Sequence, residues 1–109
     1  MRALFHPEFP RDIRRFEAEY ARISTGLSKR FRHEVEKAVD VIKQSPAGAG
    51  HFLNVGSSIV PQLRRRNLWA FPFFVLYGVT EDQIVFGSVI PSRSDPLTWL
   101  SRIPGMESG

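Results

Sequence analysis

The chain contains no cysteine among its 109 residues. This absence excludes disulfide bonds and metal sites that are built on thiolates. A reducing compartment is the natural setting for such a chain, and we expect a cytoplasmic location. Long hydrophobic runs are also lacking, since the longest, 71–77, is far shorter than the ~20 residues of a membrane-spanning helix. The apolar run before Pro7 is too short for a signal peptide, so we expect a soluble protein.

Several sequence signals of catalysis are missing as well. The chain has no nucleophile motif and no nucleotide-binding glycine pattern, and Gly48-Ala49-Gly50 lacks the residues of a phosphate-binding loop. The histidines His6, His33 and His51 are scattered and show no metal-ligand spacing. We therefore predict no metal and no cofactor. His51 follows a glycine-rich crossover at the start of a predicted strand, and it is the one histidine that we consider as a proton donor.

The composition is that of an ordinary globular protein. Hydrophobic residues make up 42% of the chain and charged residues 24%, which argues against global disorder. The length fits one domain, which we place at residues 1–102, with 103–109 as a flexible tail. The net charge is +4. In the second half of the chain every basic residue is arginine, the side chain best suited to phosphate and carboxylate recognition.

Two amphipathic helices are predicted in the first half. Apolar residues recur every three or four positions, first at Phe9, Ile13, Phe16, Tyr20 and Ile23, and then at Leu27, Phe31, Val35, Ala38, Val39 and Ile42. The first helix opens around 7–10, where prolines are tolerated. Ser24-Thr25-Gly26 separates the two stripes with capping and turn residues. Because the connection is so short, the helices form an antiparallel hairpin.

An antiparallel sheet of three to four strands is predicted for the second half, with 2–6 as a short edge strand. Strands are expected within 51–55, 59–66, 71–79 and 84–90, and 80–83 joins the last two as a hairpin. Along 71–79 the odd-numbered residues face one side, and Phe74 and Leu76 face the other. The helical hairpin would cover one face. The second face needs the C-terminal segment or a partner, or it becomes a binding surface. Residues 95–100 are expected to form a short helical turn. The fold class is thus α+β.

Arg64, Arg65 and Arg66 lie in a predicted strand, where alternate side chains face opposite sides of the sheet. Arg64 and Arg66 would then share one face, and Arg65 the other. Charges that protect an edge strand from pairing with another sheet account for such a cluster. A cationic ridge that binds phosphate accounts for it equally well.

Arg93 follows the last strand, in a loop that Pro91 and Pro96 make stiff. An exposed ion pair with Asp95 would contribute only ~0–1 kcal/mol to stability. We therefore favour a binding role for this guanidinium over a structural one.

In order and spacing, these motifs resemble the ParE/RelE superfamily of bacterial type II toxin–antitoxin toxins, in its ParE-like plasmid-stabilisation branch. The resemblance covers about residues 4–102. It rests on His6-Pro7-Glu8, on Leu27-Ser28-Lys29-Arg30-Phe31 with Val41-Ile42 and Ser45-Pro46, on Phe71-Pro72-Phe73 with Tyr77, on Val89-Ile90 with Ser92-Arg93-Ser94-Asp95-Pro96, and on Trp99-Leu100-Ser101-Arg102. It implies a helical hairpin packed on a twisted antiparallel sheet.

The resemblance also implies a function. RelE-like members are ribosome-dependent mRNA endonucleases that rely on basic and tyrosine side chains of the sheet and C-terminus, whereas ParE-like members are associated with poisoning DNA gyrase by binding. Here all three lysines lie on the second predicted helix, and no tyrosine follows Tyr77. Pro91 stands where a histidine is often found, and Ser94 where a second arginine is found.

These departures favour a ParE-like toxin that is neutralised by a cognate antitoxin and inhibits DNA gyrase, without being an enzyme. Arg64, Arg66 and Arg93 are the expected target contacts; the helical hairpin and a sheet edge are expected to bind an acidic antitoxin. One alternative is an mRNA endonuclease acting on ribosome-bound mRNA, with Arg93, Arg64 and His51 as its candidate catalytic residues. Another alternative is a degenerate, non-toxic binding module of the same family.

Overall fold

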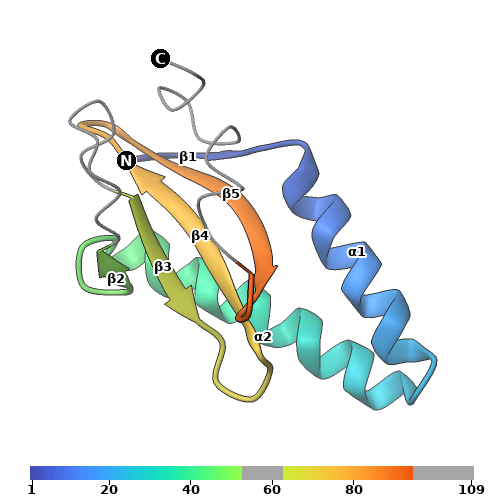
Figure 1. The fold of residues 1–109 in the computed structure, drawn as a ribbon. Coiled ribbons are helices and arrows are strands. Elements are labelled where there is room, and N and C mark those ends of the chain that lie inside the picture. Colours follow the sequence, from blue (N-terminus) through green and yellow to red (C-terminus); the bar gives the residue numbers. More distant parts are fainter. Residues whose placement is uncertain (53–62, 95–109) are drawn as a thin grey trace.

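The computed structural model describes residues 1–52 and 63–94, and shows two helices packed on one face of a twisted sheet (Figure 1). The elements, in chain order, are β1 (Arg2–Phe5), α1 (Glu8–Ala21), α2 (Thr25–Gln44), β2 (His51–Phe52), β3 (Leu63–Asn67), β4 (Phe73–Val79) and β5 (Gln83–Pro91). The predicted α+β class is confirmed. The helical turn expected at 95–100 and the tail at 103–109 lie outside the described residues.

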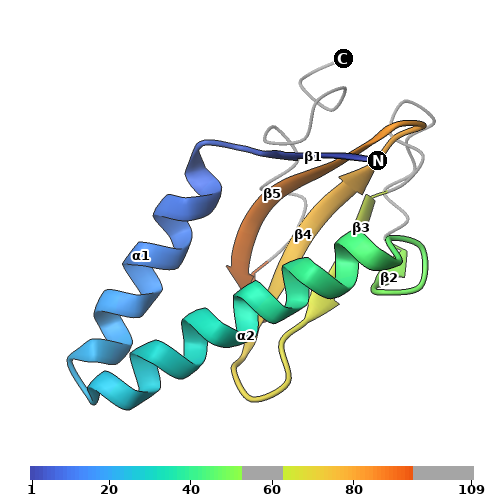
Figure 2. The same cartoon turned by 180° about the vertical axis from the view of Figure 1, so that it is seen from behind.

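The predicted helical hairpin is present, with α1 and α2 antiparallel and side by side (Figure 2). The Ser24 side chain caps α2, since its hydroxyl oxygen accepts a hydrogen bond from the Leu27 backbone N–H at 3.0 Å. Helix α1 ends at Ala21, two residues earlier than its apolar stripe predicts. Ile23 therefore lies beyond the helix and is 72% exposed, so its expected place in the core was wrong.

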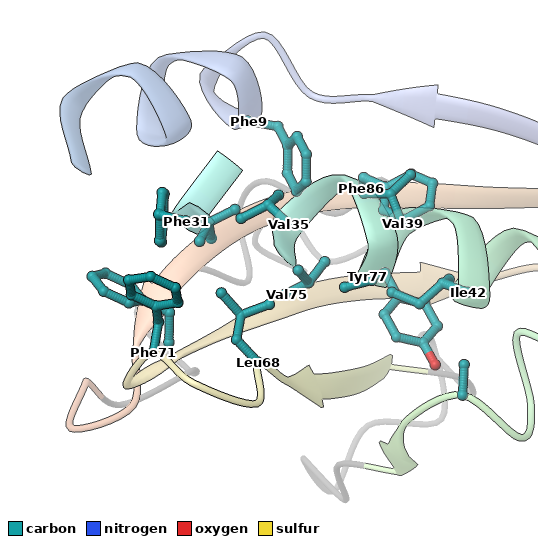
Figure 3. Packing of buried hydrophobic residues seen from close by; sticks show 14 of the residues in the cluster. Phe9, Phe31, Val35, Val39, Ile42, Leu68, Phe71, Val75, Tyr77 and Phe86 are labelled. Carbon is teal, nitrogen blue, oxygen red and sulfur yellow. The ribbon is translucent and has the colours of Figure 1, made fainter. Parts of the chain in front are cut away.

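The two apolar stripes form the helix side of the core, as their spacing predicts. The buried residues from the helices are Phe9, Phe16, Phe31, Val35, Ala38, Val39 and Ile42, and they pack on Phe73, Val75, Tyr77, Ile84, Phe86 and Val89 of the sheet (Figure 3). A fully buried side chain of this size contributes about 1.5–3 kcal/mol. The hairpin is thus fixed to the sheet by its apolar face, and its polar face remains exposed.

The sheet has five strands in the order β1-β5-β4-β3-β2. The strands β2 to β5 pair antiparallel in sequence order, but β1 pairs parallel with β5. The expected antiparallel sheet of three to four strands is therefore corrected to a mixed sheet of five. The reason is geometric: after α1 and α2 the chain enters β2 in the direction opposite to β1, and the three reversals from β2 to β5 make β5 run in the same direction as β1. The expected N-terminal edge strand is confirmed as β1.

The second face of the sheet is not an open apolar surface. Phe74 and Leu76 lie on the face opposite the helices, as their alternation predicts, and both are fully buried. Part of the cover on Phe74 is the guanidinium of Arg65, whose carbon lies 3.8 Å from the ring centroid. The possibility that this face binds a partner through exposed Phe74 and Leu76 is therefore excluded.

Asp12 of α1 binds the outer edge of β5 beyond the end of β1. Its Oδ2 accepts hydrogen bonds from the Ser88 hydroxyl at 2.6 Å and from the Val89 backbone N–H at 3.1 Å. Asp12 is only 2% exposed. The carboxylate thus takes the place of a neighbouring strand and positions α1 over the sheet.

Candidate functional site

The predicted alternation along β3 places Arg64 and Arg66 on one face and Arg65 on the other. Arg64 pairs with Tyr77 and Arg66 with Val75, both of which face the helices. Their guanidinium groups reach the loop after α2: Arg64 Nη1 donates to the Gly50 carbonyl oxygen at 3.2 Å, and Arg66 Nη1 donates to the Ala49 carbonyl oxygen at 2.6 Å. Both arginines are partly exposed. The two arginines therefore bind the loop after α2 and also place positive charge at the surface.

This loop, 45–50, follows the C-terminus of α2 and so lies at the negative end of the helix dipole. The backbone N–H groups of Gly48 and Ala49 both donate to the Ser45 carbonyl oxygen, at 3.1 and 2.8 Å, which curls the loop tightly. The carbonyl oxygens of Ala49 and Gly50 are left to accept from the arginines. Positive charge next to a helix C-terminus is favourable, so the loop and the arginines stabilise one another.

Gly50 allows the loop to approach the sheet closely. A Cβ atom at this position would lie 2.6 Å from the Arg65 carbonyl oxygen and 2.6 Å from the Tyr77 hydroxyl. Such distances are too short for any side chain, so only glycine fits without a backbone shift.

Tyr77 completes the cluster from β4. Its hydroxyl donates to the Pro46 carbonyl oxygen at 2.8 Å, so the phenol is a structural donor to the same loop. Burial raises the pKa of Tyr77 above its ordinary value of 10.0, and the nearby cations Arg64 and Arg66 lower it by a smaller amount. The phenol is therefore neutral at pH 7 and cannot act as a base there.

His51 lies on a different face from Arg64 and Arg66. It pairs with Arg65 across β2 and β3, and directly opposed residues of an antiparallel pair project to the same side. The Arg65 Nη2 and Nε atoms donate to the Asn67 side-chain oxygen at 2.8 and 3.2 Å. His51 is exposed on this far side. The structure therefore does not bring His51 together with the helix-facing arginines.

Arg93 lies at a third position, beyond the end of β5. It is exposed in a tight turn that is closed by a 2.9 Å hydrogen bond from the Ser94 N–H to the Pro91 carbonyl oxygen. The Ser92 N–H donates to the Pro72 carbonyl oxygen at 2.9 Å, which fixes the turn to the start of β4. Strand β4 lies between this turn and β3. Within residues 1–52 and 63–94 Arg93 forms no ion pair, and Asp95 lies outside the described residues.

Three contacts that position these groups were not predicted from the sequence: the Asp12 contact with β5, the stacking of Arg65 on Phe74, and the binding of Glu34 to the loop that joins β3 to β4. Each joins residues distant in sequence or on different strands, so no local spacing marks it. A buried aspartate on the apolar side of a predicted helix, as at Asp12, is the one usable signal.

Residues 1–52 and 63–94 contain no group of three or more His, Cys, Asp or Glu side chains that could hold a metal ion. None of the helices described for this chain has the length and hydropathy needed to cross a membrane.

Comparison with protein-family models gives no match, and comparison with curated proteins gives none either. Among solved structures, the chain is similar to one described as "Chromosomal ParDE TA system from P. aeruginosa". The TM-score is 0.67, and the match covers 84% of this chain and 95% of that chain at 18% sequence identity. At this identity the similarity concerns the fold. The helical hairpin on a twisted mixed sheet is therefore a ParE-like fold, shared with that chain of the ParDE system.

Proposed function

We propose that this chain is the toxin of a type II toxin–antitoxin system, neutralised by a cognate antitoxin, and that it inhibits DNA gyrase by binding rather than by cleaving RNA. The similarity to a chain of a ParDE system supports the toxin assignment. The arrangement of the candidate catalytic residues supports binding over cleavage.

The observation that carries this choice is the separation of His51 from the arginines. RNA cleavage by a ribose 2′-hydroxyl needs a base to take one proton and an acid to supply another. Arginine stays protonated and transfers protons poorly. Tyr77 is neutral and donates to Pro46, and His51 shares the face of Arg65. His51, the histidine considered as a proton donor, therefore lies on the other face from the position where Arg64 and Arg66 would hold a phosphate. His33 lines a groove with Arg66, but Arg64 does not line that groove.

Arg64, Arg66 and Arg93 remain the proposed target contacts, with different expectations for each. Arg93 is exposed on a fixed turn, so its replacement removes a contact without disturbing a described side-chain interaction. Arg64 and Arg66 also support the loop after α2, so their replacement affects folding and binding together. Arg93 is the cleaner test of the target interface.

For the antitoxin we propose a groove between α1 and α2. It has a volume of about 380 Å³ and is lined by Phe5, Phe9, Pro10, Ile13, Val35, Glu36, Val39 and Asp40. Phe5 is 45% exposed there and belongs to the edge strand β1, whose outer side has no partner strand in the described sheet. An extended antitoxin segment would add to this edge as a further strand, whereas a helical segment would place its apolar side chains in the groove. Glu36 and Asp40 at the rim favour a segment with a basic residue at this point.

The test compares gyrase supercoiling and ribosome-bound mRNA in the presence of the purified chain. We expect gyrase inhibition that the antitoxin reverses, with intact mRNA. Arg93→Ala should weaken inhibition at least about tenfold, as loss of a central arginine contact does. Arg22→Ala, which removes an equally exposed arginine between the helices, should leave inhibition within about twofold. Both variants should still bind the antitoxin.

Two results would contradict the proposal. Cleaved mRNA with unaffected gyrase would favour the endonuclease. Expression that neither slows growth nor inhibits gyrase, while antitoxin binding persists, would favour a non-toxic binding module.

A further inference from the structure

Trp69 is presented to solvent by a rigid loop. Its side chain is 96% exposed, whereas its neighbours Leu68 and Phe71 are buried in the core. The Glu34 carboxylate of α2 accepts hydrogen bonds from the backbone N–H groups of Trp69 at 2.7 Å and Ala70 at 3.0 Å. The loop is thus held by two buried side chains and by the Glu34 carboxylate, and the indole points outward. In Figure 2 this loop, joining β3 to β4, lies beside α2.

The indole borders a groove of about 460 Å³ between α2 and the end of β3. The groove is lined by His33, Glu34, Lys37, Ala38, Arg66, Asn67, Leu68 and Trp69. The Glu34 carboxylate is already occupied by the two backbone N–H groups. The charges left to meet a ligand are those of Lys37, which is exposed, and Arg66, which is partly exposed.

We propose that this groove binds an acidic peptide segment of a protein partner. Carboxylates of the segment would meet Lys37 and Arg66, and an apolar side chain would pack on Trp69. Tryptophan and arginine are the residues that most often dominate the binding energy of protein interfaces. Because Glu34 already holds the backbone that carries the indole, binding costs little backbone entropy, which strengthens such a contact.

The charge count favours a peptide over a nucleic acid. Proteins that bind single strands combine stacking aromatic residues with a cationic groove that follows the phosphate backbone. The described residues of the groove include two permanent cations beside one carboxylate, too few for a run of phosphates.

The Trp69 groove shares Arg66 with the proposed target contacts and is otherwise separate from the surfaces of the proposed function. The antitoxin groove uses Val35, Glu36, Val39 and Asp40, which lie on the opposite side of α2 at 100° per residue. Arg93 lines neither groove. The inference therefore stands whether or not gyrase is the target.

The test uses Trp69 as the reporter. The chain has two tryptophans, so Trp99→Phe leaves Trp69 as the only indole. The probe is a short synthetic peptide of alternating glutamate and leucine; the same peptide with lysine in place of glutamate is its control. We expect a saturable change in Trp69 emission with the acidic peptide alone.

A matched pair of lysine variants separates local from general charge effects. Lys37→Glu should weaken binding of the acidic peptide about tenfold or more. Lys29→Glu makes the same charge change on the same helix but outside the groove, and should change binding less than about threefold. Calorimetry on the chain with both tryptophans, and on Trp69→Ala, repeats the measurement without the reporter.

Several outcomes would overturn the proposal. One is equal weakening by the two lysine variants, and another is unchanged emission together with no heat of binding. Tighter binding of a single-stranded oligonucleotide than of the acidic peptide would assign the groove to nucleic acid. A dimer in sedimentation that Trp69→Ala abolishes would assign it to a second copy of the chain.

Discussion

The guanidinium of Arg66 donates a 2.6 Å hydrogen bond to the carbonyl oxygen of Ala49, and so joins the middle of β3 to the loop after α2. Arg64 makes the equivalent contact with Gly50, and Tyr77 with Pro46. Three side chains of the sheet thus bind three carbonyl groups of one loop. The arginines expected to contact a target also stabilise the fold.

Replacing Arg66 should therefore destabilise the protein. A hydrogen bond from a charged group contributes about 1.5–3 kcal/mol, and partial exposure reduces this to about 1–2 kcal/mol for Arg66→Ala. Arg30→Ala removes an exposed arginine from α2 and should change the free energy of unfolding by less than about 0.5 kcal/mol. Urea unfolding measures both. Equal midpoints for the two variants would mean that the Ala49 contact adds nothing to stability.

Gly50→Ala should be destabilising by about 1–3 kcal/mol, because its Cβ would lie 2.6 Å from the Arg65 carbonyl oxygen and force the loop away from β3. Gly26→Ala is the control, since its Cβ would lie 3.7 Å from the Ser24 hydroxyl, at ordinary contact distance. In α2 this change should be neutral or stabilising, because alanine favours the helix. Thermal unfolding distinguishes the two; a neutral Gly50→Ala would rule out the close approach.

Asp12→Ala should cost roughly 3 kcal/mol, because it leaves the buried Val89 N–H and the Ser88 hydroxyl without their carboxylate acceptor. Asp12→Asn keeps one oxygen acceptor and should recover part of the loss. Asp40→Ala changes an exposed aspartate of α2 and should stay within about 0.5 kcal/mol. Hydrogen exchange at Val89 adds a local readout: its amide should lose protection in Asp12→Ala. Unchanged protection would show that the carboxylate does not hold this edge.

Tyr77 should make stability fall at alkaline pH. Burial raises its pKa above the ordinary 10.0, and the cations Arg64 and Arg66 oppose this to a smaller extent. Because the folded state holds the phenolic proton more tightly than the unfolded state, the contribution to stability is complete below pH 10. It is lost as the pH rises through the folded-state pKa.

Absorbance titration of the phenolate, with denaturant unfolding at several alkaline pH values, tests this expectation. Tyr77→Phe should lower stability at pH 7 by about 0.5–1.5 kcal/mol through loss of the Pro46 hydrogen bond. The variant should also lose part of the alkaline decline; the rest belongs to Tyr20, whose pKa is raised by burial and by the charge of Glu19. An unaltered alkaline profile in Tyr77→Phe would contradict the assignment.

Periodicity predicted most of the fold because the buried residues follow it. The stripe of α2 from Phe31 to Ile42 is buried at every predicted position, and the alternation along β4 assigns Phe74 and Leu76 to the correct face. The parallel pairing of β1 with β5 could not be predicted, since strand direction leaves no local pattern in four residues. Ile23 shows where periodicity misleads: the apolar spacing continues to Ile23, but α1 ends before it and the chain turns toward Ser24, which leaves Ile23 exposed.

The candidate site was predictable only in part. Alternation placed Arg64 and Arg66 together and Arg65 apart, as the contacts show. Their acceptors are backbone carbonyl groups of a loop distant in sequence, and every residue type supplies a carbonyl. Residue identity therefore carried no sign of these bonds. The same applies to Glu34, whose partners are the backbone N–H groups beneath Trp69.

The pairing of β1 with β5 has a consequence for synthesis of the protein on the ribosome. The two strands come from opposite ends of the described chain. Strand β1 therefore leaves the ribosome early but cannot pair until β5 has been synthesised. The helical hairpin consists of local contacts and can form early, whereas this long-range contact is slow. The hydrogen bonds of Asp12 also form late, because its carboxylate accepts them from Ser88 and Val89 of β5. In a nascent chain that stops before β5, β1 therefore has no neighbouring strand and the Asp12 carboxylate has not yet been buried. Such a chain is sensitive to proteases until β5 is synthesised.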